Sequence, residues 1–253
     1  MTILYFDLET VPDQGRLSYN EDWLSQKILQ KSPDLTDQEF KTELATRLST
    51  TPETLQIVGL SIAWDNQPPS SIWGGDRTPD GVEITETRLL KIFWQQARKA
   101  THLVGYNCLW FDIPSIQTRS ALLGVRPSID LTNLKPWENV VIDLFRTRFP
   151  RGDKYQFGLK DLGKTLNLPI PESLKHCWGT DGGNASQMWG AALETGDFSD
   201  CKDYGKFDIA LTRELARLWS GHFFPSIIPS RADIEIEYAY IAGGFVNDPP
   251  EGY

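Results

Sequence analysis

The sequence has few of the residues that form covalent or metal cross-links. Its 253 residues include three cysteines and three histidines, scattered along the chain without a Cys-x-x-Cys pair. This favours reduced thiols and argues against both a disulfide framework and a zinc cluster. No apolar run approaches the roughly 18 to 20 residues of a membrane span, and no basic region followed by an apolar core opens the chain. We therefore expect a soluble, cytoplasmic protein with no membrane partner.

Positive charge is also scarce. The chain has 25 lysines and arginines against 34 acidic residues, a formal net charge of −9. Simple nucleic-acid-binding proteins usually carry a basic surplus, so this balance does not favour one. The charge is uneven, however: residues 135–175 contain eight basic and five acidic residues, which makes that segment +3 and the remainder −12. Such a stretch could steer a phosphate backbone towards one face, or it could be an ordinary solvated face.

Core-forming residues are abundant. Hydrophobic residues make up 40% of the chain and include nine tryptophans, which excludes disordered and fibrous classes.

Strand-like patterns at 3–9, 56–64 and 70–74 predict that the fold begins with three antiparallel strands. Helical spacing at 85–99, 112–124, 159–166 and 198–219 then alternates with short strands at 101–105 and 140–144. We expect an α/β fold, a mixed sheet of three antiparallel strands followed by parallel strands, flanked by helices.

Two acids lie on one face of the first predicted strand. Side chains alternate along a strand, so Asp7 and Glu9 project to the same side. Carboxylates at the end of a buried strand are costly to ionise unless a cation compensates them. Oxygen ligands without a nearby histidine or cysteine favour Mg²⁺ or Mn²⁺. The alternative is an exposed strand end that binds nothing.

Three further residues strengthen the metal interpretation. Asp112 could be a ligand, or it could be only the N-cap of the next helix. Asp208 lies on the apolar side of the last long helix, where an unpaired acid would destabilise the fold. Tyr204 precedes it by four residues, so the two are neighbours on one helix face, although a tyrosine there can also belong to the core.

These acids lie in three short segments, FDLET at 6–10, GYNCLWFDIP at 105–114 and YGKFD at 204–208. In order and spacing the segments resemble the motifs of the DEDD superfamily of 3′–5′ exonucleases, in the subgroup with tyrosine in the third motif. The resemblance is strongest to the proofreading domain of family-B DNA polymerases and covers about residues 2–220. It implies an RNase H-like fold.

The resemblance also implies a two-metal-ion mechanism. Asp7, Glu9, Asp112 and Asp208 would hold two divalent cations, Mg²⁺ or Mn²⁺, at the 3′-terminal phosphodiester. One cation would activate a water and the other would stabilise the leaving oxygen. Tyr204 would orient the water as a neutral phenol, since a tyrosine has a pKa near 10. Two cations would offset four acids, so an acidic exonuclease is no contradiction.

Three more residues match substrate-binding positions of that family. Asn107 and Phe111 would contact the terminal nucleotides, by hydrogen bonding and by packing against bases. Thr10 would offer its backbone to the terminal 3′ hydroxyl. Without the resemblance, Asn107 could be a turn residue and Phe111 a core residue.

The expected function is removal of nucleoside 5′-monophosphates from the 3′ end of single-stranded DNA, because a narrow acidic site needs unpaired nucleotides. An exoribonuclease is an alternative, since the sequence does not reveal contacts to a 2′-hydroxyl. A non-catalytic module that binds nucleic acid or docks a partner on the same fold is a third interpretation.

Two parts of the chain are expected. Residues 1–222 would form the exonuclease domain, with a helical insert at about 13–54, and 223–253 would form a C-terminal extension. The segment AYIAGGFVNDPPEGY at 239–253 resembles the link that leads from exonuclease to palm in family-B-like polymerases. The chain would then be a stand-alone exonuclease or the proofreading part of a DNA polymerase, with a polymerase module as partner.

Overall fold

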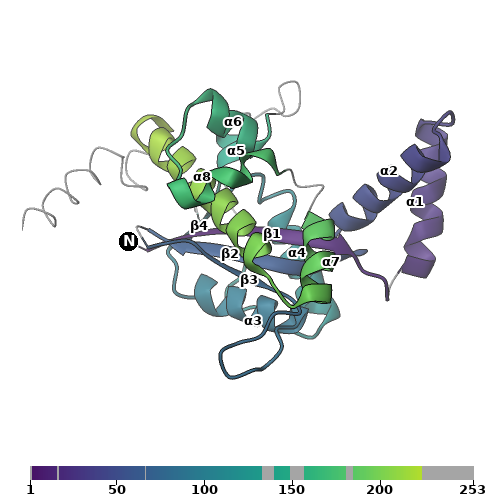
Figure 1. Cartoon of the computed structure of the whole chain (residues 1–253), viewed down its shortest axis with the longest axis horizontal. Helices are drawn as coiled ribbons and strands as arrows, with labels where there is room; N and C mark the ends of the chain where they lie inside the picture. Colours follow the sequence, from purple (N-terminus) through teal and green to yellow (C-terminus); the bar gives the residue numbers. More distant parts are fainter. Residues whose placement is uncertain are drawn as a thin grey trace, which may run out of the picture.

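The computed structural model describes residues 2–15, 17–65, 67–132, 140–148, 157–180 and 185–223. Within these residues, helices surround a five-stranded sheet (Figure 1). The strands are β1 (Ile3–Pro12), β2 (Leu55–Trp64), β3 (Ser70–Trp73), β4 (His102–Gly105) and β5 (Val141–Asp143). The helices are α1 (Leu17–Lys31), α2 (Asp37–Thr50), α3 (Glu86–Ala97), α4 (Asp112–Leu122), α5 (Leu144–Arg148), α6 (Leu159–Thr165), α7 (Ala185–Thr195) and α8 (Ser199–Phe223), with a 3₁₀ helix, η1, at Glu172–Gly179.

The sheet is mixed, with the strand order β3-β2-β1-β4-β5. β1 pairs antiparallel with β2, and β2 with β3, whereas β4 is parallel to both β1 and β5. The predicted pairing senses are therefore present, and the architecture is compatible with an RNase H-like fold. The order across the sheet differs from the order along the chain, because the parallel strands are added beside β1 and not beside β3. This makes β1 the central strand.

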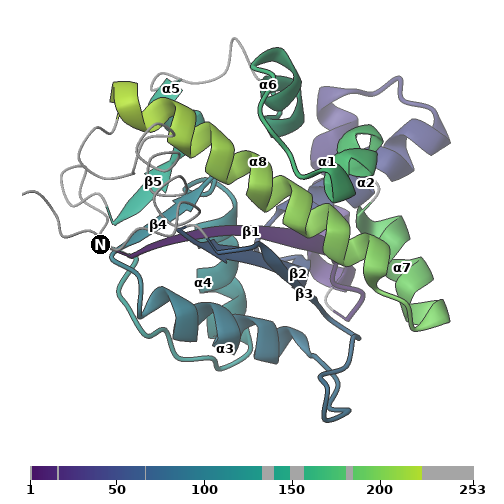
Figure 2. The same cartoon turned by 60° about the vertical axis from the view of Figure 1, so that its left-hand side comes forward.

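Alternation along β1 divides the core into two layers. Leu4, Phe6 and Leu8 pack in the cluster that contains residues of α3 and α4. Ile3 and Tyr5 pack in the cluster that contains residues of α8. Figure 2 shows α8 crossing one side of the sheet while α3 and α4 lie on the other side. Odd-numbered side chains of β1 therefore face α8.

The polar insert contains α1 and α2, which form a helical hairpin that projects from the body of the protein (Figure 1). A capping box begins α2, because Thr36 Oγ1 accepts from the Glu39 amide and Glu39 Oε2 accepts from the Thr36 amide. The hairpin has a small core of its own, made by Leu24, Ile28, Leu44 and Leu48.

Three helical segments were not expected from the sequence. They are α5, η1 and α7, each of which is short and lacks a long amphipathic pattern.

The last helix, α8, extends to Phe223, and the remainder of the predicted C-terminal extension lies outside the described residues. Among the helices of the described ranges, none is long and apolar enough to cross a membrane. All three cysteines are unpaired and buried.

Candidate functional site

Three carboxylates come together between β1 and α8. One oxygen from each of Asp7, Glu9 and Asp208 lies within 4.8 Å of the other two. Asp7 and Glu9 share the face of β1 that is directed at α8, as strand alternation predicts. Asp208 comes from the middle of α8, 199 positions further along the chain than Glu9.

Small residues let α8 approach the sheet closely enough to form this cluster. A Cβ atom on Gly205 would lie 2.1 Å from Ser61 Oγ and 2.4 Å from Ser71 Oγ, so only glycine fits there. Ser61 is the β2 partner of Asp7 in the sheet register. The close contact at Gly205 therefore lies beside Asp7, and Asp208 follows three residues later, within one helical turn.

A second glycine makes room for Glu9. Gly59 faces Glu9 across the β1–β2 ladder, and a Cβ atom on Gly59 would lie 2.9 Å from the Glu9 Cβ. The ladder also changes register immediately after Glu9, at the step to Thr10. Such irregularities redirect side chains near functional sites.

Asp112 lies next to the three acids without joining their cluster. It begins α4, and its Oδ1 accepts a hydrogen bond of 3.1 Å from the Leu8 amide, between Asp7 and Glu9. Its charge is close enough to raise the pKa of Asp7. The structure therefore brings Asp7, Glu9 and Asp208 together and leaves Asp112 adjacent, with one carboxylate oxygen already occupied.

Burial raises the pKa of every one of these carboxyls. The pKa reaches about 6 for Asp208 and about 7 for Asp112. For Asp7 and Glu9 it lies well above the ordinary range, because repulsion from the neighbouring carboxylates adds to burial. Four ionised acids this close are stable only when positive charge compensates them.

Lys160 supplies part of that positive charge. Its Nζ lies 3.5 Å from Asp208 Oδ1 and 4.0 Å from the centre of the Tyr204 ring, and it donates to the Thr180 carbonyl. Sequence reasoning missed Lys160 as a site residue. The available signal was its position in the basic segment 135–175, where it is one of eight positively charged residues. A cavity of about 480 Å³ opens here, lined in part by Lys160, Tyr204 and Asp208.

Tyr204 is buried and neutral. It lies one turn before Asp208 on α8. Burial, and to a lesser extent repulsion from the Glu9 carboxylate, raises the pKa of its phenol far above 10. Its hydroxyl can therefore donate or accept a hydrogen bond but does not act as a free base near neutral pH.

The donor set fits a hard divalent cation. Asp208 Oδ1 is buried, and among the described residues its contact with Lys160 at 3.5 Å is an ion pair too long for a strong hydrogen bond, which leaves a lone pair available inside the cluster. All three members of the cluster are carboxylates, and oxygen donors suit Mg²⁺ and Mn²⁺. Asp7, Glu9 and Asp208 could therefore bind a metal ion.

The three predicted substrate-binding residues have different surroundings. The Thr10 hydroxyl donates to the Ser49 carbonyl in α2, so its side chain is already engaged. Asn107 has a positive φ of 61°, and its backbone amide donates a hydrogen bond to Asp143 Oδ1. Phe111 is partly buried against the core layer beneath α3 and α4.

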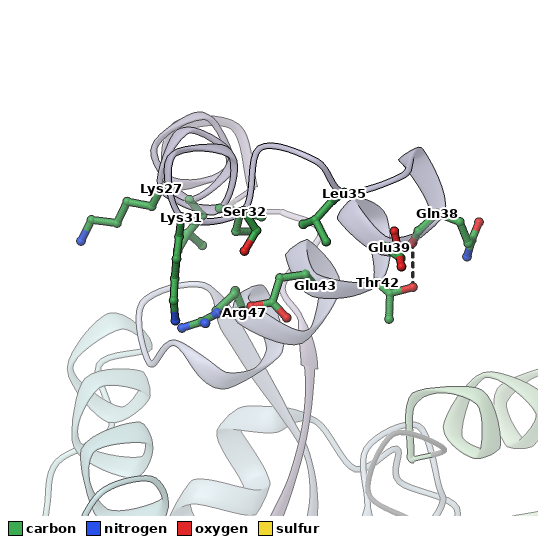
Figure 3. Close-up of a pocket in the computed structure, with 11 residues that line it drawn as sticks. Lys27, Lys31, Ser32, Leu35, Gln38, Glu39, Thr42, Glu43 and Arg47 are labelled. Atoms are coloured by element: carbon green, nitrogen blue, oxygen red, sulfur yellow. Dashed lines mark hydrogen bonds and ion pairs between the residues drawn. The ribbon is translucent and has the colours of Figure 1, made fainter.

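A separate cavity of about 600 Å³ lies between α1 and α2 (Figure 3). Its lining combines apolar residues with charged ones from both helices, and none of the clustered acids belongs to it. The helical hairpin therefore has a hollow of its own, distinct from the acid cluster.

Comparisons with known proteins find likeness in structure but none in sequence. No family model matches the chain, and no curated protein matches it. The fold is similar to that of a family B DNA polymerase from the hyperthermophilic archaeon Pyrobaculum calidifontis, with a TM-score of 0.56 and 16% identity. The match covers 96% of this chain and 29% of the polymerase, so the chain spans under a third of that protein's length. At this identity the likeness concerns the fold alone.

Proposed function

We propose that this chain is a metal-dependent 3′–5′ exonuclease of the DEDD type, with an RNase H-like fold. It hydrolyses single-stranded DNA from the 3′ end and releases nucleoside 5′-monophosphates. The observation that carries the proposal is the cluster of Asp7, Glu9 and Asp208, in which the buried Oδ1 of Asp208 faces the Lys160 ammonium at 3.5 Å. The fold likeness to a family B DNA polymerase supports it.

Each acid has a role in holding cations. Asp7, Glu9 and Asp208 would hold the first, and Asp112 would join Asp7 in holding a second through the oxygen that does not bind the Leu8 amide. Two divalent cations, when bound, lower the pKa of the attacking water and compensate the charge on the leaving oxygen.

The remaining residues orient the reactants. Tyr204 holds the attacking water by a hydrogen bond from its neutral phenol, in line with the scissile phosphorus. The ammonium of Lys160, beside Asp208, fixes that carboxylate and adds positive charge near the phosphate. The Thr10 hydroxyl is engaged by Ser49, and Thr10 offers its backbone to the terminal 3′ hydroxyl. Asn107 and Phe111 contact the terminal nucleotides.

A polymerase module is the partner that this proposal implies. The structural likeness covers almost all of this chain but under a third of the polymerase. In that arrangement the exonuclease would proofread the 3′ end that the polymerase module extends.

A cleavage assay tests the proposal. Single-stranded DNA, RNA and blunt duplex, each 5′-labelled, are incubated with Mg²⁺, Mn²⁺ or EDTA. We expect a ladder that shortens one nucleotide at a time from the 3′ end of single-stranded DNA and disappears in EDTA. Asp7→Ala and Asp208→Ala should each lower the rate by several orders of magnitude, because a metal ligand is lost.

Asp203→Ala is the matched control. Asp203 is on the same helix but half-exposed, in a surface ion pair with Lys206, so its loss should leave the rate nearly unchanged. Near-normal cleavage by Asp7→Ala would exclude Asp7 as a ligand. Faster cleavage of RNA would favour an exoribonuclease, and strand binding without cleavage would favour a non-catalytic module.

A further inference from the structure

Trp110 is an exposed aromatic residue in the turn between β4 and α4. Its side chain is 67% exposed, more than any other large hydrophobic residue in the described ranges. A tryptophan offers a large apolar surface, and leaving it in water forfeits the burial that stabilises most aromatic residues. Its exposure beside an acid cluster therefore invites a functional explanation.

The indole of Trp110 is held in a defined position. The Arg146 guanidinium lies 4.0 Å from the centre of the indole ring. The carboxylate of Asp143 fixes both sides of this pair, because it accepts hydrogen bonds from the amides of Asn107 and Leu109 in the turn and of Phe145 in α5. Trp110 and Arg146 are thus presented by two segments that share one buried anchor.

Topology puts this pair at the edge of the sheet where the acids lie. β4 and β5 are parallel and end at Gly105 and Asp143, so the segments that follow them leave the sheet at the same edge. β1 is parallel to β4 and pairs with it from Ile3 to Tyr5, and it then continues past the end of β4 to Asp7 and Glu9. In α/β sheets, ligands bind outside the carboxyl ends of parallel strands.

The link to the acid cluster is also direct along the chain. Trp110 precedes Asp112 by two residues, and Asp112 is hydrogen-bonded to the Leu8 amide of β1. A ligand that reached the clustered acids would therefore pass close to the indole.

The chemistry of the pair suits an unpaired nucleotide. A flat indole with a free face can stack on any base, and a guanidinium can pair with a phosphate. Bases inside a duplex have both faces covered by their neighbours, so only an unpaired base can stack there. The segment 135–175, which contains Arg146, is the basic part of an acidic chain and would attract a phosphate backbone.

We infer that Trp110 and Arg146 form a stacking platform for an unpaired base of the DNA strand whose 3′ end enters the acid cluster. This inference rests on the proposed exonuclease function and deepens it, because the platform would select single strands.

Binding of abasic oligonucleotides tests the platform. The probes are fluorescein-labelled oligothymidylates that each lack one base at a different distance from the 3′ end, and fluorescence anisotropy measures their affinity in EDTA. For the unmodified chain we expect a loss of affinity at one position, roughly 5- to 150-fold, the range of one base–aromatic stacking contact. In Trp110→Ala the intact strand should bind more weakly by a similar factor, and the abasic position should cost nothing further.

Two variants separate stacking from general damage to the protein. Trp110→Phe keeps a smaller aromatic face and should retain part of the affinity and part of the abasic effect. Trp23→Ala removes another exposed tryptophan that is covered by a cation, Lys27 at 3.8 Å, but lies on the helical hairpin, and it should bind like the unmodified chain.

The outcomes distinguish the two proposals. An abasic profile that is the same in Trp110→Ala and the unmodified chain would overturn the platform, even if the chain cleaves DNA. Absence of cleavage with Mg²⁺ or Mn²⁺ would overturn the exonuclease, even if Trp110 governs strand binding.

Discussion

Replacing Asp208 with asparagine should stabilise the protein in the absence of metal. Burial raises the pKa of Asp208 from an ordinary value of 3.8 to about 6. One unit of pKa corresponds to about 1.4 kcal/mol, so keeping this carboxylate ionised at pH 8 costs roughly 3 kcal/mol. This is an upper limit, because burying the asparagine amide also costs free energy. For a chain of this size we expect Asp208→Asn to raise Tm by about 3 to 10 °C in EDTA at pH 8.

The increase in Tm caused by Asp208→Asn should depend on pH in a defined direction. A carboxyl whose pKa is higher in the folded protein than in the unfolded chain binds its proton more tightly when folded. Its destabilising effect is therefore absent below about pH 4, grows as pH rises to about 6 and is constant above that. The difference in Tm between Asp208→Asn and the unmodified chain should shrink accordingly towards pH 4.

Divalent cations should reverse the order of stability. A ligand that binds only the folded protein adds about 2.7 kcal/mol at one hundred times its Kd. Mn²⁺ or Mg²⁺ should therefore raise the Tm of the unmodified chain, more at pH 8 than at pH 5 because protons compete for the same oxygens. Asp208→Asn should lose most of this increase, because it lacks one of the three clustered carboxylates.

Differential scanning calorimetry at pH 4, 5, 6 and 8, with and without metal, measures all of these effects. Asp203→Asn is the control, since this half-exposed acid on α8 should change neither Tm nor its response to metal. A lower Tm for Asp208→Asn than for the unmodified chain in EDTA at pH 8 would refute the inference that burial makes the ionised Asp208 carboxylate destabilising. An undiminished metal response would refute the assignment of Asp208 as a ligand.

Three further predictions concern Tyr204, the close packing of α8, and the buried ion pair of Arg119 with Glu86. Tyr204→Phe should slow cleavage without changing the metal-dependent rise in Tm, and an unchanged rate across pH would remove Tyr204 from the mechanism. Gly205→Ala should lower Tm and weaken the metal response, because its Cβ has no space. Gly190→Ala in α7 should instead stabilise the protein by up to about 1 kcal/mol, because nothing lies near its Cβ and alanine favours helix; equal effects of the two changes would contradict the close packing of α8. Arg119→Met should cost about 3 to 5 kcal/mol in urea unfolding by leaving Glu86 buried without its partner, and Glu86→Gln in the same chain should recover part of that loss.

Local periodicity was sufficient to predict the pairs within one element. Asp7 and Glu9 share a face because strand side chains alternate, and Tyr204 and Asp208 share one because a helix repeats every 3.6 residues. The capping box of α2 could also be predicted, since its two residues, Thr36 and Glu39, are only three positions apart in the sequence.

Contacts between elements could not be predicted in this way. Lys160 reaches Asp208 from α6, and Arg146 reaches Trp110 from α5. The sequence shows that these residues are basic or aromatic, but many others are too. Which of them meet depends on how the helices pack, and that depends on side chains distributed over the whole chain.

The sequence by itself determined the acids, their order and the faces that they occupy. Only the tertiary structure decided that β1 lies at the centre of the sheet, and that α8 approaches it closely at Gly205. It also decided that Asp112 binds the Leu8 amide and lies outside the group of three acids. The physical reason is that backbone periodicity is a property of neighbouring residues. Strand order and the distance from helix to sheet follow instead from hydrogen bonds and packing between residues far apart in the chain.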